Sequence, residues 1–221
     1  MSRFLWLWIP VFIFIVQIGI ELWVPLRKYE PLHTENGPIE LLQAYILLIA
    51  AIIAGRWLIK ERKNYDLFLK VWIGIAFVGC VYVIGEEVSW GQHIFFWATP
   101  EEWAAINDQA ETNIHNASSW FDQKPRILLE VGTIIGGLIL PILAARKSLA
   151  WFPQWLRPII PSLKMVVVAS LFLVIKIMDT VGDVTDWVFI KRSSEVTEFY
   201  LYYFVLLYLY WLTNALRNPQ R

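Results

Sequence analysis

Residues 67–85 read LFLKVWIGIAFVGCVYVIG, and the polar run EEVSWGQH follows at once over residues 86–93. Lys70 is the only charged residue in the first run. That run matches the ~20 mostly apolar residues that a helix needs to cross a bilayer. The second run puts acidic, hydroxyl and imidazole side chains directly at the end of the span. Together the two runs predict a membrane helix that ends at a polar site.

Five further segments qualify as spans, near residues 4–25, 39–59, 127–145, 159–179 and 196–216. The six spans fill more than half of the 221 residues and leave no room for a separate soluble domain. We therefore predict an all-α polytopic bundle, a single transmembrane domain over residues 1–221, with a short interfacial helix in the loop 86–126. No small-residue cleavage site follows the first span, so we expect an uncleaved helix kinked at Pro10.

Composition excludes several other classes of protein. Hydrophobic residues make up 57% of the chain and charged residues only 17%, against about 25% in soluble domains. The chain has 19 basic and 19 acidic residues, so we expect no basic surface for a nucleic-acid partner. The single cysteine, Cys80, excludes an intrachain disulfide and a cysteine-based zinc cluster.

The Lys and Arg distribution predicts that both termini are cytoplasmic. The termini and the loops on their side hold ten of these residues, whereas the opposite loops hold six. Acids show the reverse bias: only Glu61 and Asp66 lie on the cytoplasmic side, and 17 of 19 lie outside with all three histidines. Acids contribute little to membrane insertion, so this bias indicates a functional site on the external side.

The start of the external loop offers a possible nucleophile. If the third span continues as a helix, Glu86, Ser89 and His93 share one face. Ser89 would then be a catalytic nucleophile with His93 as its base. The alternative is chance, because a serine and a histidine four residues apart are common.

The middle of the same loop offers metal ligands. A helix beginning near Pro100 would bring Asn107, Glu111 and His115 to one face at intervals of four residues. Zinc accepts imidazole nitrogen and carboxylate oxygen, so a divalent metal is the candidate cofactor, and its predicted ligands are Glu87, Glu111, His115 and His93. The alternative is a solvated loop in which Glu111 only pairs with His115.

Acids also open several spans on the external side. Glu40 opens the second span and Glu198 the sixth, and either could act as general base or support the metal ligands. In the fifth span, Lys176 is expected to pair with Asp179. Ionisable residues within spans usually face the bundle interior, so these side chains predict one outward-facing polar cup. The alternative is that such acids only mark the membrane interface.

Three stretches resemble a family of uncharacterised bacterial multi-pass membrane proteins: ENGPIE over residues 35–40, GEEVSWGQ over 85–92, and N-x-Q-x-E-x-N-x-HN over 107–116. The resemblance implies a bacterial inner (plasma) membrane protein, but no reaction. Members of that family often carry arginine where this chain has His93, which makes His115 the stronger candidate ligand.

The pair Ser89 and His93 is also distantly similar to the Ser-x-x-x-His of the ceramidase and adiponectin-receptor superfamily. This chain lacks the late His-x-x-x-His of those hydrolases.

The sequence leaves two functions open. One is a metal-assisted hydrolase or transferase that acts on a membrane lipid or a lipid-linked substrate. The other is a non-enzymatic carrier or accessory subunit, associated with lipid or with other membrane subunits, whose polar cup binds a cation or polar ligand.

The orientation can be tested by cysteine labelling in intact cells. We expect a membrane-impermeant maleimide to label the variant Ser118→Cys from outside, because loop 86–126 is predicted to be external. Cys80 lies within a span and serves as the background in unmodified protein. Labelling that needs permeabilised cells would reverse the orientation.

Overall fold

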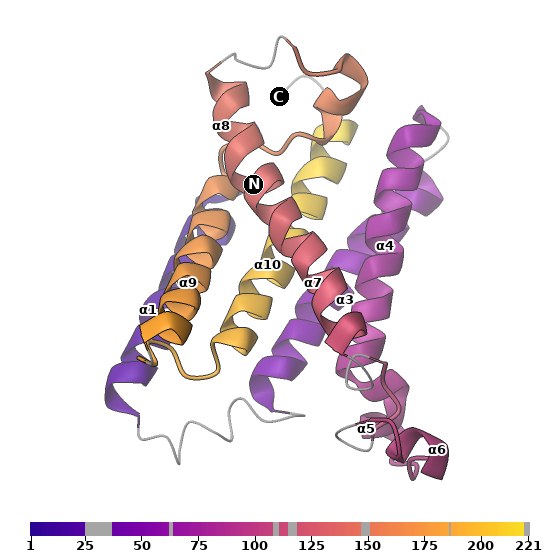
Figure 1. The fold of residues 1–221 in the computed structure, drawn as a ribbon. Coiled ribbons are helices and arrows are strands. Elements are labelled where there is room, and N and C mark those ends of the chain that lie inside the picture. Colours follow the sequence, from indigo (N-terminus) through magenta and orange to yellow (C-terminus); the bar gives the residue numbers. More distant parts are fainter. Residues whose placement is uncertain are drawn as a thin grey trace.

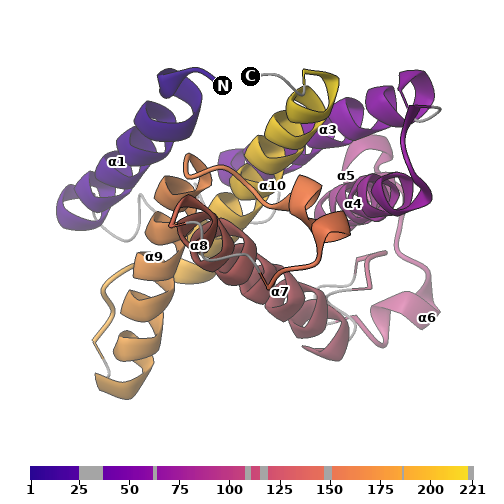
Figure 2. The same ribbon diagram turned by 90° about the horizontal axis from the view of Figure 1, so that it is seen from above.

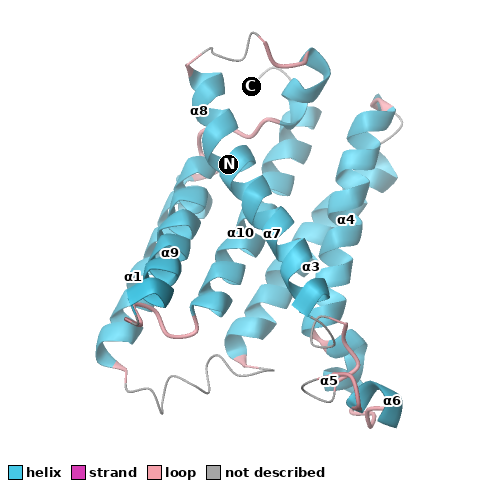
Figure 3. Cartoon of the chain, viewed as in Figure 1, coloured by secondary structure: helices cyan, strands magenta, loops and turns pink. Residues whose placement is uncertain are grey.

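A computed structural model describes residues 1–24, 37–61, 64–107, 111–114, 119–146, 151–185 and 187–218, and the side chains of residues 93, 94 and 119–123 lie outside that description. The chain is 81% helical, and the described part contains no strand (Figure 3). Within the described ranges, six helices are long and apolar enough to cross a membrane. The predicted all-α polytopic bundle is therefore confirmed.

The six spans are Phe4–Trp23, which ends in α1 (Ile9–Trp23), α3 (Pro38–Lys60), α4 (Leu67–Glu87), Lys124–Ala145, α9 (Met165–Thr185) and α10 (Ser193–Arg217). The span Lys124–Ala145 comprises most of α7 (Ser119–Ile134), a π-helical segment (Ile135–Ile139) and α8 (Leu140–Ala145). Two short helices, α5 (Gln92–Phe95) and α6 (Glu101–Ala104), lie together at one end of the bundle (Figure 1). We call this the loop end; both termini lie toward the other end (Figures 1 and 2).

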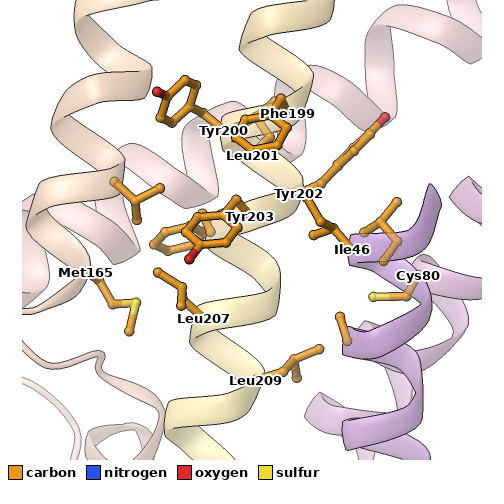
Figure 4. Close-up of a cluster of buried hydrophobic side chains, with 14 of the residues drawn as sticks. Ile46, Cys80, Met165, Phe199, Tyr200, Leu201, Tyr202, Tyr203, Leu207 and Leu209 are labelled. Carbon is orange, nitrogen blue, oxygen red and sulfur yellow. The ribbon is translucent and has the colours of Figure 1, made fainter. Parts of the chain in front are cut away.

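Helix α10 forms the centre of the bundle. It packs against α3 on one side and α9 on the other, and α3 packs in turn against α4 (Figure 2). Most of its aromatic side chains are buried, among them Phe199, Tyr200 and Tyr203 (Figure 4). The aromatic character of the last span therefore serves core packing.

Two tyrosine hydroxyls tie α10 to the first span. Residues Phe4–Trp8 form a π-helical turn in which the amide of Ile9 donates to the carbonyl of Phe4. In this register the carbonyl of Leu5 would need the amide of Pro10, which proline lacks. The Tyr203 hydroxyl donates to the Leu5 carbonyl instead, at 2.7 Å. The Tyr200 hydroxyl donates to the carbonyl of Pro10 at 2.9 Å.

The predicted start of the fifth span, near residue 159, was wrong. Helix α9 begins at Met165, and Gln154–Ile159 forms a short 3₁₀ helix before it. Pro158 and Pro161 explain the difference, because proline lacks an amide hydrogen and disfavours helical backbone in the preceding residue. Ile160 accordingly adopts an extended conformation.

The close approach of three helices at Gly137 gives a stability test. A Cβ atom there would lie 2.6 Å from the Ala169 Cβ and 2.7 Å from a Phe204 ring carbon. We expect Gly137→Ala to destabilise the bundle by about 1–3 kcal/mol, the usual cost of overpacking.

Gly136→Ala is the matched control, because nothing lies within 4 Å of its Cβ position and alanine favours helix over glycine by about 1 kcal/mol. Equilibrium unfolding in mixed micelles, followed by tryptophan fluorescence, measures both variants. Equal stability of the two would contradict the packing described.

Candidate functional site

The Glu86 carboxylate at the end of α4 holds the loop that follows. This side chain is buried, with 4% of its surface exposed. One oxygen accepts from the Trp90 indole at 2.6 Å, and the other from the backbone amide of Ile114 at 2.7 Å. Because a buried charge is costly unless it is hydrogen-bonded, Glu86 serves as a structural clamp.

The chain turns sharply after Glu87 and does not continue as a helix. Ser89, Trp90 and Gly91 have φ values of 44°, 53° and 105°, in the left-handed region. A Cβ at Gly85 would lie 2.9 Å from the Trp90 ring, so glycine lets the indole fold back onto α4. The predicted shared helical face of Glu86, Ser89 and His93 was therefore wrong.

Ser89 lies inside a network of amide, hydroxyl and carboxylate groups. Its hydroxyl donates to Glu111 at 2.6 Å and accepts from the Asn113 side chain at 3.0 Å. Asn113 also donates to the same Glu111 oxygen at 2.8 Å. The Asn107 side chain donates to Asn113, and its oxygen accepts from the Glu111 amide. Because Ser89 is fully buried, it has no open face for a substrate.

The predicted helix through Asn107 and Glu111 was also wrong. Helix α6 ends at Ala104, and residues 111–114 are not helical. Side chains replace the helical backbone bonds: the Gln92 oxygen accepts from both the amide and the hydroxyl of Thr112, at 2.8 and 2.9 Å. We use the name loop clamp for the hydrogen-bonded residues Glu86, Ser89, Gln92, Asn107, Glu111, Thr112 and Asn113.

A second group of polar side chains lies within the bundle, at the loop end of α3, α4 and α10. The charges that act on the Glu87 carboxylate, among the described residues, are those of Glu198, Glu40 and Glu195. The Tyr202 hydroxyl donates to Glu87 at 3.0 Å. We call these five residues the carboxylate cluster.

A chain of ion pairs flanks the carboxylate cluster. Arg126 lies 3.0 Å from Glu198 and 3.3 Å from Glu130, and Lys176 lies 3.1 Å from Glu130. The chain thus links α9, α7 and α10. The predicted pairing of Lys176 with Asp179 was wrong; Asp179 instead accepts a hydrogen bond from the Ser193 hydroxyl. Lys176 therefore pairs with Glu130 on the neighbouring helix α7 in place of Asp179 on its own helix.

The predicted site residues thus separate into two groups. Glu40, Glu87 and Glu198 belong to the carboxylate cluster, whereas Ser89 and Glu111 belong to the loop clamp. His115 and the side chain of His93 lie outside the described residues. Within the described ranges, no three His, Cys, Asp or Glu side chains are arranged to hold a metal ion.

Sequence reasoning missed two contributors to the site. One is Arg126, whose spacing of four from Glu130 is a recognisable ion-pair signal. The other is Gln43, which lies one turn after Glu40 and whose contact with α10 depends on how two distant segments pack. Its Nε2 donates to the backbone carbonyl of Glu195 at 2.8 Å.

Comparisons with known proteins give no relative: no family model, curated protein or solved structure matches the chain. Any functional conclusion therefore rests on the residues themselves.

The loop clamp can be tested with Glu86→Gln. The amide nitrogen of glutamine cannot accept a hydrogen bond, so either Trp90 or Ile114 loses its acceptor. We expect a loss of about 1–3 kcal/mol in stability, as for a buried donor left without a partner, and faster cleavage of loop 96–118 in limited proteolysis. The control Glu102→Gln, at an exposed position of α6, should behave as wild type. If the Glu86→Gln variant is cleaved at the same rate as wild type, the clamp does not order the loop.

Proposed function

We propose that the carboxylate cluster binds a cationic ligand larger than a metal ion, from the external face of the bacterial inner membrane. The observation that carries this proposal is the environment of Glu87, on which the negative charges of three further glutamates act, Glu198, Glu40 and Glu195. Like charges oppose one another strongly in a medium of low dielectric constant. A bound cation would lower the electrostatic energy of all four carboxylates together.

The position of the charged groups supports the same conclusion. The carboxylate cluster and the ion-pair chain contain five glutamates, Glu40, Glu87, Glu130, Glu195 and Glu198, and two cations, Arg126 and Lys176. These groups lie at or near the ends of spans, where ionisable groups are costly and usually functional.

We propose a binding or accessory role in place of transport. A carrier must offer polar groups to its ligand from both sides of the membrane. The side predicted to be cytoplasmic contributes only Glu61 and Asp66 among the 19 acids. A ligand would therefore be held at the external face, in contact with lipid headgroups or with another membrane subunit.

The competing hypothesis is a metal-assisted hydrolase or transferase. It requires three or four protein ligands around one ion. Glu111, one of the predicted ligands, is hydrogen-bonded to Ser89 and Asn113. His115 is the stronger of the two predicted imidazole ligands, so its removal tests the metal hypothesis.

Ligand-dependent stability of protein in phosphatidylcholine nanodiscs tests the proposal. We expect ethanolamine or spermidine to raise the melting temperature of wild type, because a ligand bound only to the native state stabilises it, by about 2.7 kcal/mol at ~100 Kd. Glu87→Gln should abolish the effect by removing the central charge, whereas the exposed control Glu102→Gln should keep it. No stabilisation by any organic cation would contradict the proposal.

A chelator experiment decides the metal alternative. If the cup holds zinc, purified wild type should contain stoichiometric metal, EDTA should lower its melting temperature, and His115→Ala should lose both properties. The proposal of an organic cation predicts that EDTA leaves the melting curve unchanged. Stoichiometric metal that depends on His115 would replace this proposal with the metal-assisted enzyme.

A further inference from the structure

One buried acceptor beside the carboxylate cluster has no hydrogen-bond donor among the described residues. Gln43 lies in the first turns of α3 with no exposed surface. Its Oε1 atom receives no hydrogen bond from any described residue. An unsatisfied buried acceptor costs about 1–3 kcal/mol, and native structures keep few of them without a reason.

The orientation of the Gln43 amide is fixed by its other end. Nε2 donates to the Glu195 carbonyl at 2.8 Å. Turning the amide over would set two oxygen acceptors against each other, so Oε1 must remain the atom without a donor.

Gln43 is a near neighbour of two residues of the carboxylate cluster, Glu40 and Glu195. Glu40 is three residues earlier on α3 and therefore on nearly the same face of the helix. Glu195, whose backbone holds the amide, opens α10. The carboxylates of both residues act on Glu87. An uncharged acceptor and several anionic acceptors thus border one region at the loop end.

We infer that the cationic ligand carries a primary ammonium group, and that Gln43 Oε1 accepts one of its hydrogen bonds while Glu87 and its neighbours supply the opposite charge. This inference rests on the proposed function and names its ligand class. A primary ammonium has three N–H donors and needs several acceptors. A quaternary ammonium has the same charge and no N–H, so it leaves Oε1 unsatisfied.

A methylation series in wild-type protein tests the donor requirement without any mutation. The probes are ethanolamine, N-methylethanolamine, N,N-dimethylethanolamine and choline, titrated into protein in phosphatidylcholine nanodiscs. We expect affinity to fall along the series and ethanolamine to bind about tenfold or more tightly than choline, the factor expected for one hydrogen bond to a charged group. Equal affinity for ethanolamine and choline would overturn the inference.

The variant Gln43→Met keeps the length of the side chain and removes the acceptor. It should bring the ratio of ethanolamine to choline affinity close to one, while charge-dependent binding of both persists. Gln17→Met is the matched control, because Gln17 is also buried in a span but donates to Glu21. An unchanged ratio in Gln43→Met would assign the selectivity to other residues and overturn the role of Gln43.

The pattern of results separates this inference from the proposed function. If choline binds as well as ethanolamine and Glu87→Gln abolishes both, the cation site stands and the ammonium inference falls. If no probe binds wild type, both fall. If Gln43→Met does not fold, the methylation series alone decides.

Lipid and soluble sources of the amine are distinguished by the bilayer. Stabilisation by phosphatidylethanolamine in the nanodisc, with a weaker response to added ethanolamine, would identify a lipid headgroup. Stabilisation by free ethanolamine that is unaffected by phosphatidylethanolamine would identify a soluble amine.

Discussion

The hydrocarbon interior of a membrane offers no hydrogen bonds, so each polar group that enters it must find a partner within the protein. This constraint explains why the chain forms helices throughout the membrane and why its irregular backbone is confined to the ends. It also explains the Leu5 carbonyl: Pro10 removes its backbone donor, and a tyrosine from the other end of the chain supplies one. The Gln43 oxygen is one of six buried side-chain atoms that have no hydrogen-bond partner among the described residues.

Two neighbouring glutamates connect the loop clamp to the carboxylate cluster. Successive residues of a helix point about 100° apart, so Glu86 and Glu87 at the end of α4 face different surroundings. Glu86 binds Trp90 and the loop, whereas Glu87 meets Tyr202 and the acids of α3 and α10. The clamp therefore fixes the last turn of α4, and with it the central carboxylate of the proposed site.

The spans could be predicted from sequence because their signal is local: a run of apolar residues reaches the required length. The predicted start of the fifth span was wrong at Pro158 and Pro161. The apolar composition continues through these residues, but the two prolines prevent a continuous helix. The predicted helix in the loop was wrong for a different reason. Amide and hydroxyl side chains, among them Asn107 and Thr112, take over hydrogen bonds that helical spacing assigned to the backbone. Glu40, Glu87 and Glu198 were identified from their positions at span ends, but the contact of Gln43 with α10 depends on segments 152 residues apart.

The position of α10 in the chain has a consequence for biogenesis. Synthesis proceeds from the N-terminus, so α10 enters the membrane after the five spans that precede it. It brings the hydroxyl that satisfies Leu5, the carbonyl that holds Gln43 and the acid that pairs with Arg126. Until then the first span retains the Leu5 carbonyl without its tyrosine donor, and the carboxylate cluster lacks the residues that α10 supplies. Capture of the proposed ligand would therefore require that α10 is already inserted.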